Sequence, residues 1–347
     1  MITFLLAFSA TCLNLSNSSI DIGVPSLPPP FSIGTISIPT FSRQHLFLKI
    51  ILHYNLVERY SRQLLVLGLG IQQRLNELKI LIAGCGALGS AIAELLARLG
   101  VGEITVIDAD VVDVTNLHRV HLFDENDVGK PKAEICAKKL SLINSSIKIN
   151  YIIDILDEQN VEKLISDKDY VFDALDSLYY KLLLNDATVK LRKILIYGGI
   201  NGEYGSVKLV DSNQTSCLSC FINYSDQDEI GNSCDVIGTT PLIVELTATL
   251  QVNLMLNHLR GNPDYSLFYI DSRELKIERI NVEKNFQCKT CVLNEYPFLN
   301  QKITKPNCGI FRVNMKVTEL DKPKVFKNIG NVILCYPNIG CFEKRGR

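Results

Sequence analysis

Short apolar runs alternate with longer stretches of helical spacing along the chain from about residue 56 to residue 200. The apolar runs are rich in β-branched residues, which is typical of buried strands. The predicted strands lie at 80–83, 104–107, 147–153, 169–176 and 194–197. The predicted helices lie at 56–78, 90–99, 132–142, 158–165 and 179–192. This alternation predicts an α/β fold whose mostly parallel sheet is covered on both faces.

The pattern changes after about residue 203. A strand is predicted at 205–210, an apolar helix at 240–259, and a hairpin formed by 267–271 and 275–280. The polar and acidic stretch at about 223–238 has no period and is predicted to be a loop. The expected fold is therefore a Rossmann-like, doubly wound sheet that is mostly parallel and continues into an antiparallel part.

The turn after the first predicted strand contains Gly84, Gly86 and Gly89, in the spacing Gly-x-Gly-x-x-Gly. In a βαβ unit the first glycine permits a tight turn, the second lets the backbone approach a phosphate, and the third lets the helix pack closely. The next strand ends in Asp108, whose carboxylate can accept hydrogen bonds from ribose hydroxyls. Together these features predict a nucleotide site without specifying the nucleotide. The alternative is a glycine-rich turn that binds nothing.

Other candidate groups also follow predicted strands, where ligands of parallel sheets bind. Asp176 and Gly198-Gly199 are expected at carboxyl ends of strands. The chain has no Walker A sequence, so a triphosphate must be held by other cations. The candidate cations are Arg62, Arg119 and Lys132. Asp176 can bind Mg²⁺ through carboxylate oxygens, or it can instead cap the helix that follows.

Two Cys-x-x-Cys pairs, Cys217 with Cys220 and Cys288 with Cys291, offer four thiolates. Four thiolates satisfy tetrahedral Zn²⁺ with no open position, so the predicted zinc site is structural. The alternatives are two redox pairs, unrelated thiols or an iron–sulfur cluster. Cys234 lies in the predicted polar loop and is either a nucleophilic thiol or an ordinary surface cysteine.

Composition places few further limits. The chain has 347 residues, a formal net charge of −1 and 47% hydrophobic residues, which favours a globular protein and gives no electrostatic reason to expect nucleic acid or a membrane as partner. Its 11 cysteines are not spaced as a disulfide framework. Cys-x-x-Cys pairs in a nucleotide-binding protein favour metal binding in a reducing, cytoplasmic compartment.

The two ends of the chain differ from its middle. Residues 1–55 are predicted to be an extension that is disordered or not part of the functional protein. The apolar stretch 1–13 lacks a basic leading region and is too short to span a membrane. The sequence suggests no role for the tail at 292–347.

Several motifs occur in order along residues 56–291. They are Arg59-Tyr-Ser-Arg62-Gln63, the glycine turn, Asp108-Ala-Asp110, Asn116-Leu-His-Arg119, Val128-Gly-Lys-Pro-Lys132, Asp173-Ala-Leu-Asp176 and the two cysteine pairs. This ordered set resembles the ThiF/MoeB/HesA family, the adenylyltransferases of molybdopterin and thiamin biosynthesis, which are similar to the adenylation domain of ubiquitin-activating enzymes. The resemblance implies that residues 56–291 form an adenylation domain.

The resemblance also implies a reaction. ATP with Mg²⁺ adenylates the C-terminal Gly-Gly carboxylate of a ubiquitin-like sulfur-carrier protein, and Zn²⁺ is held by the four cysteines. The implied nucleotide-binding residues are Gly84, Gly86, Gly89, Asp108 on the ribose, Asp110, Asn116, Arg119 and Lys132 on the phosphates, and Asp176 on Mg²⁺. Arg62 matches an arginine that reaches the triphosphate of a neighbouring subunit, which implies a homodimer. Cys234 matches a crossover-loop cysteine that takes part in sulfur transfer in some members.

One residue departs from the family pattern, and two other functions stay open. Ser177 follows Asp176 where the family usually has asparagine, which leaves the placement of Mg²⁺ less certain. The same glycine turn also allows an NAD-dependent oxidoreductase, and the cysteine pairs allow a non-catalytic, zinc-stapled module that binds a ubiquitin-like partner. The tail is too short for a rhodanese domain, so we expect sulfur to come from another protein. Molybdopterin, thiamin, tRNA thiolation and a peptide product all fit the sequence.

Overall fold

The computed structural model describes residues 58–224, 238–303 and 305, and the short segments 309–313, 324–328, 331–336 and 339–345. The predicted extension at 1–55 and most of the predicted loop at 223–238 lie outside these residues. No helix in the described segments combines the length and the apolar character needed to cross a lipid bilayer.

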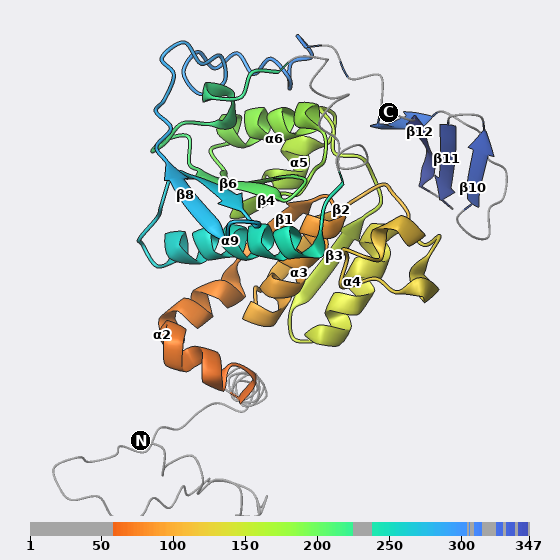
Figure 1. The fold of residues 1–347 in the computed structure, drawn as a ribbon, viewed down its shortest axis with the longest axis horizontal. Helices are drawn as coiled ribbons and strands as arrows, with labels where there is room; N and C mark the ends of the chain where they lie inside the picture. Colours follow the sequence, from red (N-terminus) through yellow and green to blue (C-terminus); the bar gives the residue numbers. More distant parts are fainter. Residues whose placement is uncertain are drawn as a thin grey trace, which may run out of the picture. The chain divides into compact units, whose positions relative to one another are not determined.

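The central sheet has eight strands in the order β3-β2-β1-β4-β5-β6-β7-β8 (Figure 1). Its parallel strands are β1 (Lys79–Ala83), β2 (Glu103–Ile107), β3 (Lys148–Ile152), β4 (Tyr170–Asp173) and β5 (Ile194–Asn201). Its antiparallel strands are β6 (Tyr204–Val210), β7 (Leu267–Asp271) and β8 (Lys276–Ile280). The predicted fold, a mostly parallel sheet continuing into an antiparallel part, is confirmed.

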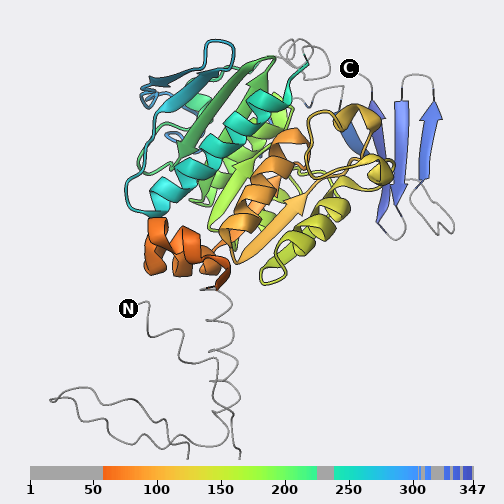
Figure 2. The same ribbon diagram turned by 60° about the horizontal axis from the view of Figure 1, so that its bottom comes forward.

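Helices cover both faces of this sheet (Figure 2). The helices are α2 (Ser61–Glu77), α3 (Ala87–Leu99), α4 (Lys132–Ile143), α5 (Val161–Ile165), α6 (Leu178–Lys190) and α9 (Pro241–Leu259), with short 3-10 turns at η2 (Val114–Asn116), η3 (Glu125–Asp127) and η4 (Leu218–Cys220). One apolar core joins the sheet to α3, α4 and α9, and a second joins it to α5, α6 and the segment after Phe298. Side chains of one strand alternate between the two cores, because successive residues point to opposite faces.

Strand β5 is longer than predicted. Gly198 and Gly199 do not end the strand after Tyr197, as the sequence suggested, but continue it to Asn201 and pair with Val207 and Ser206 of β6. The two glycines leave room for neighbouring side chains, because a Cβ on Gly198 would lie 2.4 Å from the Gln251 amide oxygen. They therefore serve packing inside the sheet.

The tail contains a second sheet that the sequence did not reveal. Its strands are β9 (Gly309–Val313), β10 (Lys324–Asn328), β11 (Asn331–Tyr336) and β12 (Gly340–Arg345), all antiparallel, in the order β10-β11-β12-β9. A disulfide joins Cys335 and Cys341, which are direct partners across the β11–β12 hairpin. This is a local link inside one hairpin rather than a framework.

Candidate functional site

The glycine turn lies at the carboxyl edge of the parallel strands and is held by its neighbours on both sides. The Gly84 N–H donates to the Ile107 carbonyl at the end of β2, with 2.9 Å between the atoms. The Ala174 N–H, just after β4, donates to the Ala83 carbonyl at 3.0 Å. The turn is thus fixed between the ends of three adjacent strands, the place where ligands of such sheets bind.

The three glycines meet different surroundings. Gly84 has φ +94°, which favours glycine, and a Cβ there would lie 2.7 Å from the Ala174 carbonyl oxygen. A Cβ on Gly89 would lie 2.0 Å from the Gly84 oxygen, so helix α3 can approach the turn only without a side chain. A Cβ on Gly86 would meet nothing within 4 Å. Gly86 is also the N-cap of α3, and no side chain caps that helix.

The space beside Gly86 therefore suits a phosphate. It is open, it lies at the N-terminal end of a 13-residue helix, and the helix dipole favours an anion there.

Asp108 follows β2 and is bound to the glycine turn. Its carboxylate accepts the Cys85 N–H at 2.7 Å and the Asp110 N–H at 2.8 Å. Burial raises the pKa of Asp108 above its ordinary value and outweighs the opposing attraction of Lys132. The residue as a whole is half-buried, and each of its two carboxylate oxygens accepts one backbone N–H.

Lys132 and Asp110 form an ion pair beside this turn. Their Nζ and Oδ2 atoms are 2.9 Å apart, and both side chains are largely buried. Burial alone would raise the pKa of Asp110, but the attraction of Lys132 and Lys344 outweighs burial and lowers that pKa well below its usual range. Burial opposes the charge on Lys132 too, yet Asp110 and Asp108 raise its pKa above the ordinary value. Lys132 is therefore charged at neutral pH.

Asn116 and Arg119 lie in the segment after β2, as predicted, and are bound within it. The Asn116 amide oxygen accepts the Asp113 N–H at 3.0 Å and completes a cap on η2. The Arg119 guanidinium donates to the Thr115 carbonyl at 2.7 Å. In this conformation Arg119 faces its own loop, and it must turn to reach a nucleotide.

Asp176 lies beyond the carboxyl end of β4 and is exposed. It contributes to the raised pKa of Lys132, so the two groups are near enough to attract each other. The alternative prediction, that Asp176 caps the next helix, is wrong, because the N-cap of α6 is Ser177. Asp176 therefore lies between the end of β4 and the N-cap of α6.

Arg62 lies at the opposite edge of the sheet. Its neighbour Gln63 donates to the Leu99 carbonyl at 2.9 Å, and Leu99 is the last residue of α3. The glycine turn is at the other end of that helix, which spans about 20 Å at 1.5 Å per residue. The structure of one chain therefore does not bring Arg62 to its own glycine turn.

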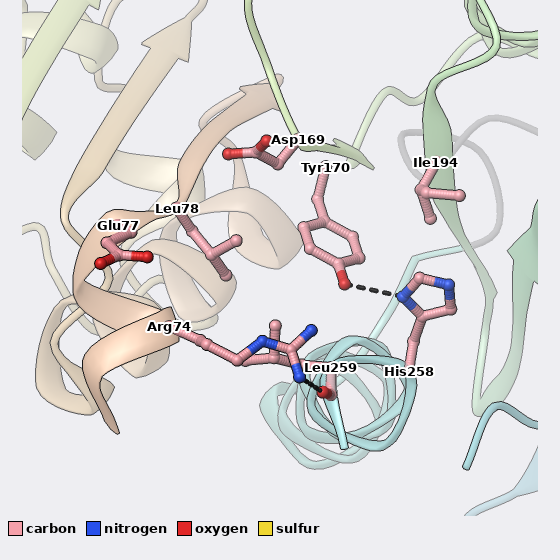
Figure 3. Close-up of a pocket in the computed structure, with 8 residues that line it drawn as sticks. All are labelled: Arg74, Glu77, Leu78, Asp169, Tyr170, Ile194, His258 and Leu259. Atoms are coloured by element: carbon pink, nitrogen blue, oxygen red, sulfur yellow. Dashed lines mark hydrogen bonds between the residues drawn. The ribbon is translucent and has the colours of Figure 1, made fainter. Parts of the chain in front are cut away.

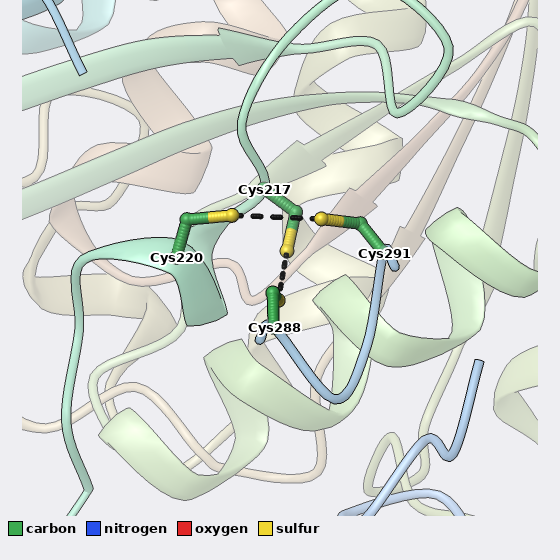
Figure 4. Close-up of side chains that lie close together, drawn as sticks. All are labelled: Cys217, Cys220, Cys288 and Cys291. Atoms are coloured by element: carbon green, nitrogen blue, oxygen red, sulfur yellow. Dashed lines mark hydrogen bonds between the residues drawn. The ribbon is translucent and has the colours of Figure 1, made fainter. Parts of the chain in front are cut away.

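The four cysteines of the two pairs converge, as predicted (Figure 4). Their sulfur atoms all lie within 4.8 Å of one another, with 3.6 Å between Cys217 and Cys288 and 3.5 Å between Cys220 and Cys291. Four sulfurs around a tetrahedral zinc ion are roughly 3.8 Å apart, given Zn–S bonds of about 2.3 Å. The cluster thus fits zinc in number, type and spacing of ligands. Cys234 lies outside the described residues.

Residues 60–290 match the ThiF family. The chain belongs to that family. Among curated relatives, the sulfur carrier protein ThiS adenylyltransferase of Bacillus subtilis is 35% identical over 262 residues, covering 72% of this chain and 77% of the relative. The sulfur carrier protein adenylyltransferase of Thermus thermophilus is 29% identical over 246 residues, covering 68% and 90%. These relatives confirm the prediction of an enzyme of the adenylyltransferase class.

Other relatives are longer or are known as structures. The adenylyltransferase and sulfurtransferase MOCS3 of Arabidopsis thaliana is 29% identical over 242 residues. The aligned region covers 68% of this ThiF-family chain but only 52% of that longer protein. The crystal structure of Escherichia coli MccB with ATP superposes with a TM-score of 0.59 at 26% identity, covering 74% of this chain and 83% of MccB. MccB with AMPCPP and MccA gives a TM-score of 0.60 at 27% identity, covering 73% and 82%.

Helix α6 contributes polar residues to the cysteine cluster that sequence reasoning missed. The Asn185 amide oxygen accepts the Leu218 N–H at 3.0 Å. Asp186 accepts the Thr290 hydroxyl at 2.6 Å and the Phe298 N–H at 2.8 Å. One helix thus anchors both cysteine-bearing segments. The signal in the sequence was an adjacent Asn-Asp pair directly after the apolar run at 182–184 of this helix.

A hollow of about 340 Å³ lies at the amino edge of the sheet (Figure 3). It is lined by residues that precede or begin strands, including Leu78, Tyr170 and Ile194, and by His258 of α9. The Tyr170 hydroxyl lies 2.7 Å from the His258 Nδ1 atom. Because ligands of parallel sheets bind at the carboxyl edge, this hollow is not the candidate active site.

Proposed function

We propose that this ThiF-family enzyme adenylates the C-terminal carboxylate of a small, ubiquitin-like sulfur-carrier protein that ends in Gly-Gly. A carboxylate oxygen attacks the α-phosphorus of ATP, the bond from that phosphorus to the bridging oxygen breaks, and pyrophosphate leaves. The product is an acyl-adenylate. The observation that carries the proposal is the open space at Gly86, in a turn whose Cys85 N–H is bound by Asp108, a carboxylate that attracts the buried and charged Lys132.

The main physical obstacle is that one anion must attack another. Lys132 and the N-terminal end of α3 supply positive charge from fixed positions, so little reorganisation is needed as charge moves to the leaving group. Arg119 adds a second cation after leaving Thr115, and Asn116 adds an amide to the phosphates. Asp108 holds the ribose, and Asp110 fixes Lys132.

We assign Asp176 to Mg²⁺, which would neutralise phosphate charge when bound. An exposed carboxylate beyond the carboxyl end of β4 is the kind of oxygen donor that Mg²⁺ prefers, and its neighbour Ser177 occupies the N-cap position of α6. The four cysteines hold a structural zinc ion, and Cys234 is a candidate for sulfur transfer.

We propose a homodimer, in which Arg62 of one subunit serves the triphosphate site of the other. The support is the position of α2, which holds Arg62 at the edge remote from its own glycine turn. The carrier assignment rests on the names of the Bacillus and Thermus relatives, and sulfur incorporation for thiamin or molybdopterin follows from it. MccB was crystallised with MccA, so a peptide terminus is the competing substrate.

The test is carrier-dependent exchange of labelled pyrophosphate into ATP. Asp176→Ala should abolish exchange, whereas Asp167→Ala should not. The control Asp167 is an exposed aspartate that precedes β4 and so lies at the opposite edge of the sheet. Unchanged exchange in Asp176→Ala would remove the metal assignment. Tighter binding of NADH than of ATP by the unaltered protein would favour the oxidoreductase alternative, and carrier binding without nucleotide turnover would favour a non-catalytic module.

A further inference from the structure

The second sheet packs against the residues that carry the nucleotide site. Leu334, Tyr336 and Phe342 form an apolar cluster with Ala109 and Ile153, which follow β2 and β3. The buried Tyr336 hydroxyl donates to the Ala109 carbonyl at 2.7 Å. Ala109 lies between Asp108 and Asp110, so strands β11 and β12 are fixed to the segment that presents both carboxylates.

One side chain of this sheet reaches the ion pair itself. The Lys344 Nζ lies 2.9 Å from Asp110 Oδ2, the same oxygen that Lys132 contacts at 2.9 Å. Lys344 is less than half exposed, whereas the Asp110 side chain is nearly buried. Two ammonium groups therefore share one carboxylate oxygen at the carboxyl edge.

The charge balance of this cluster depends on Lys344. Asp110 lies between the positive charges of Lys132 and Lys344, and the carboxylates of Asp108, Asp113 and Asp176 also act on these two lysines. Without Lys344 less of this negative charge would be balanced, and the cluster would repel a triphosphate more strongly. Lys132 would also be the only ammonium on that Asp110 oxygen, and it would be held there more tightly.

We propose that Lys344 of β12 is a positioning residue that neutralises Asp110, so that the positive charge of Lys132, which Asp110 holds in place, remains available to the phosphates of ATP. The second sheet is then a working part of the nucleotide site. Lys344 acts through Asp110 and need not touch the nucleotide. This inference rests on the proposed use of ATP and adds a residue from outside the region 60–290 that matches the ThiF family.

The test compares Lys344→Met and Lys344→Arg by calorimetric titration with Mg·ATP and, separately, with adenosine. Lys344→Met should weaken Mg·ATP binding by about fivefold or more, which is about 1 kcal/mol or more, because Asp110 then attracts Lys132 alone. Adenosine carries no phosphate, so its affinity should not change. Lys344→Arg keeps the charge and should bind both ligands as the unaltered protein does, and higher salt should shrink the effect.

The matched control is Lys327→Met, which removes a lysine from β10, a strand separated from β12 by β11. It should leave both affinities unchanged. If the unaltered protein binds Mg·ATP and Lys344→Met binds it equally well, this inference fails and the proposed function stands. Equal loss of ATP and adenosine in Lys344→Met would show a merely structural role and would also overturn it. If the unaltered protein does not bind ATP, both proposals fail.

Discussion

Gly86 and Gly89 should respond in opposite ways to the same added methyl group. They lie three positions apart in one turn, and alanine at either adds a single Cβ. At Gly86 that Cβ meets nothing within 4 Å, and the backbone there has φ −79°, which alanine adopts. At Gly89 it would lie 2.0 Å from the Gly84 oxygen, 2.9 Å from the Gly84 carbonyl carbon and 3.2 Å from the Ala174 Cβ.

The stability changes follow from these contacts. Gly86→Ala should alter the free energy of unfolding by no more than about 1 kcal/mol, because it also lowers the entropy of the unfolded chain. Gly89→Ala should cost about 3 kcal/mol or more, because its closest contact is backbone that cannot rotate away. For a domain of this size that corresponds to a fall of roughly 6–12 °C in the melting temperature.

Binding should separate the two variants further. Gly86→Ala places a methyl group where the backbone must approach the phosphates, so it should weaken ATP binding by about tenfold or more, which is 1.4 kcal/mol or more. Thermal melting and titration with ATP are sufficient assays. If Gly86→Ala melts normally and binds ATP normally, the phosphates do not lie at this turn. If Gly89→Ala melts like the unaltered protein, the close packing of α3 on the turn is incorrect.

Three further predictions concern the buried polar groups and the cysteines. Lys181→Met removes the ammonium that lies 3.1 Å from Asp173, whose side chain has 0% exposure. Urea unfolding should show that the free energy of unfolding falls by about 3–5 kcal/mol, and a fall below about 1 kcal/mol would refute the pairing. Burial raises the pKa of Asp186 to about 6, so the folded state binds more protons than the unfolded state between about pH 4 and pH 6. As the pH rises from about 4 to about 6, the unfolding free energy should therefore fall by about 3 kcal/mol relative to that of Asp186→Asn. A difference between the two proteins that stays constant with pH would contradict this prediction. Metal analysis should find about one zinc ion per chain, which Cys288→Ser should lose. The control Cys136→Ala changes a buried cysteine outside the cluster and should retain the zinc ion. Equal zinc content in the two variants would exclude the site.

The sheet and the glycine turn could be predicted from sequence because their signals are local. The strands β1, β2 and β4 are short apolar runs, each followed by a helix, and β1, β2 and α3 are found within a few residues of their expected bounds. Helix α3 begins earlier than predicted, at Ala87, because Gly86 serves as its N-cap without a side chain. The cysteine cluster was also predictable, because one tetrahedral zinc ion needs four thiolates, and the two Cys-x-x-Cys pairs can supply them whatever their separation in the sequence.

The second sheet and the role of Lys344 were not predictable, because their signals are not local. Strand β9 pairs with β12 although many residues separate them, and neither strand has a distinctive apolar run. The bond from Lys344 to Asp110 joins positions 234 residues apart. The continuation of β5 through Gly198 and Gly199 was missed for a related reason. Glycines usually weaken strands, and these two are explained only by side chains that come close in the fold, Gln251 at Gly198 and Tyr197 with Ser206 at Gly199.

The cysteine cluster also bears on how the chain folds. Its two cysteine pairs are 71 residues apart in the sequence. They meet beside α6, where Asn185 binds the segment of the first pair and Asp186 binds the segment of the second. While the chain is being synthesised, Cys217 and Cys220 leave the ribosome before Cys288 and Cys291 do. Until the second pair has emerged, the cluster has only half of its ligands. Capture of the proposed zinc ion would therefore be a late event in synthesis, and the absorption of a cobalt ion bound by four thiolates would report when the two distant segments have docked.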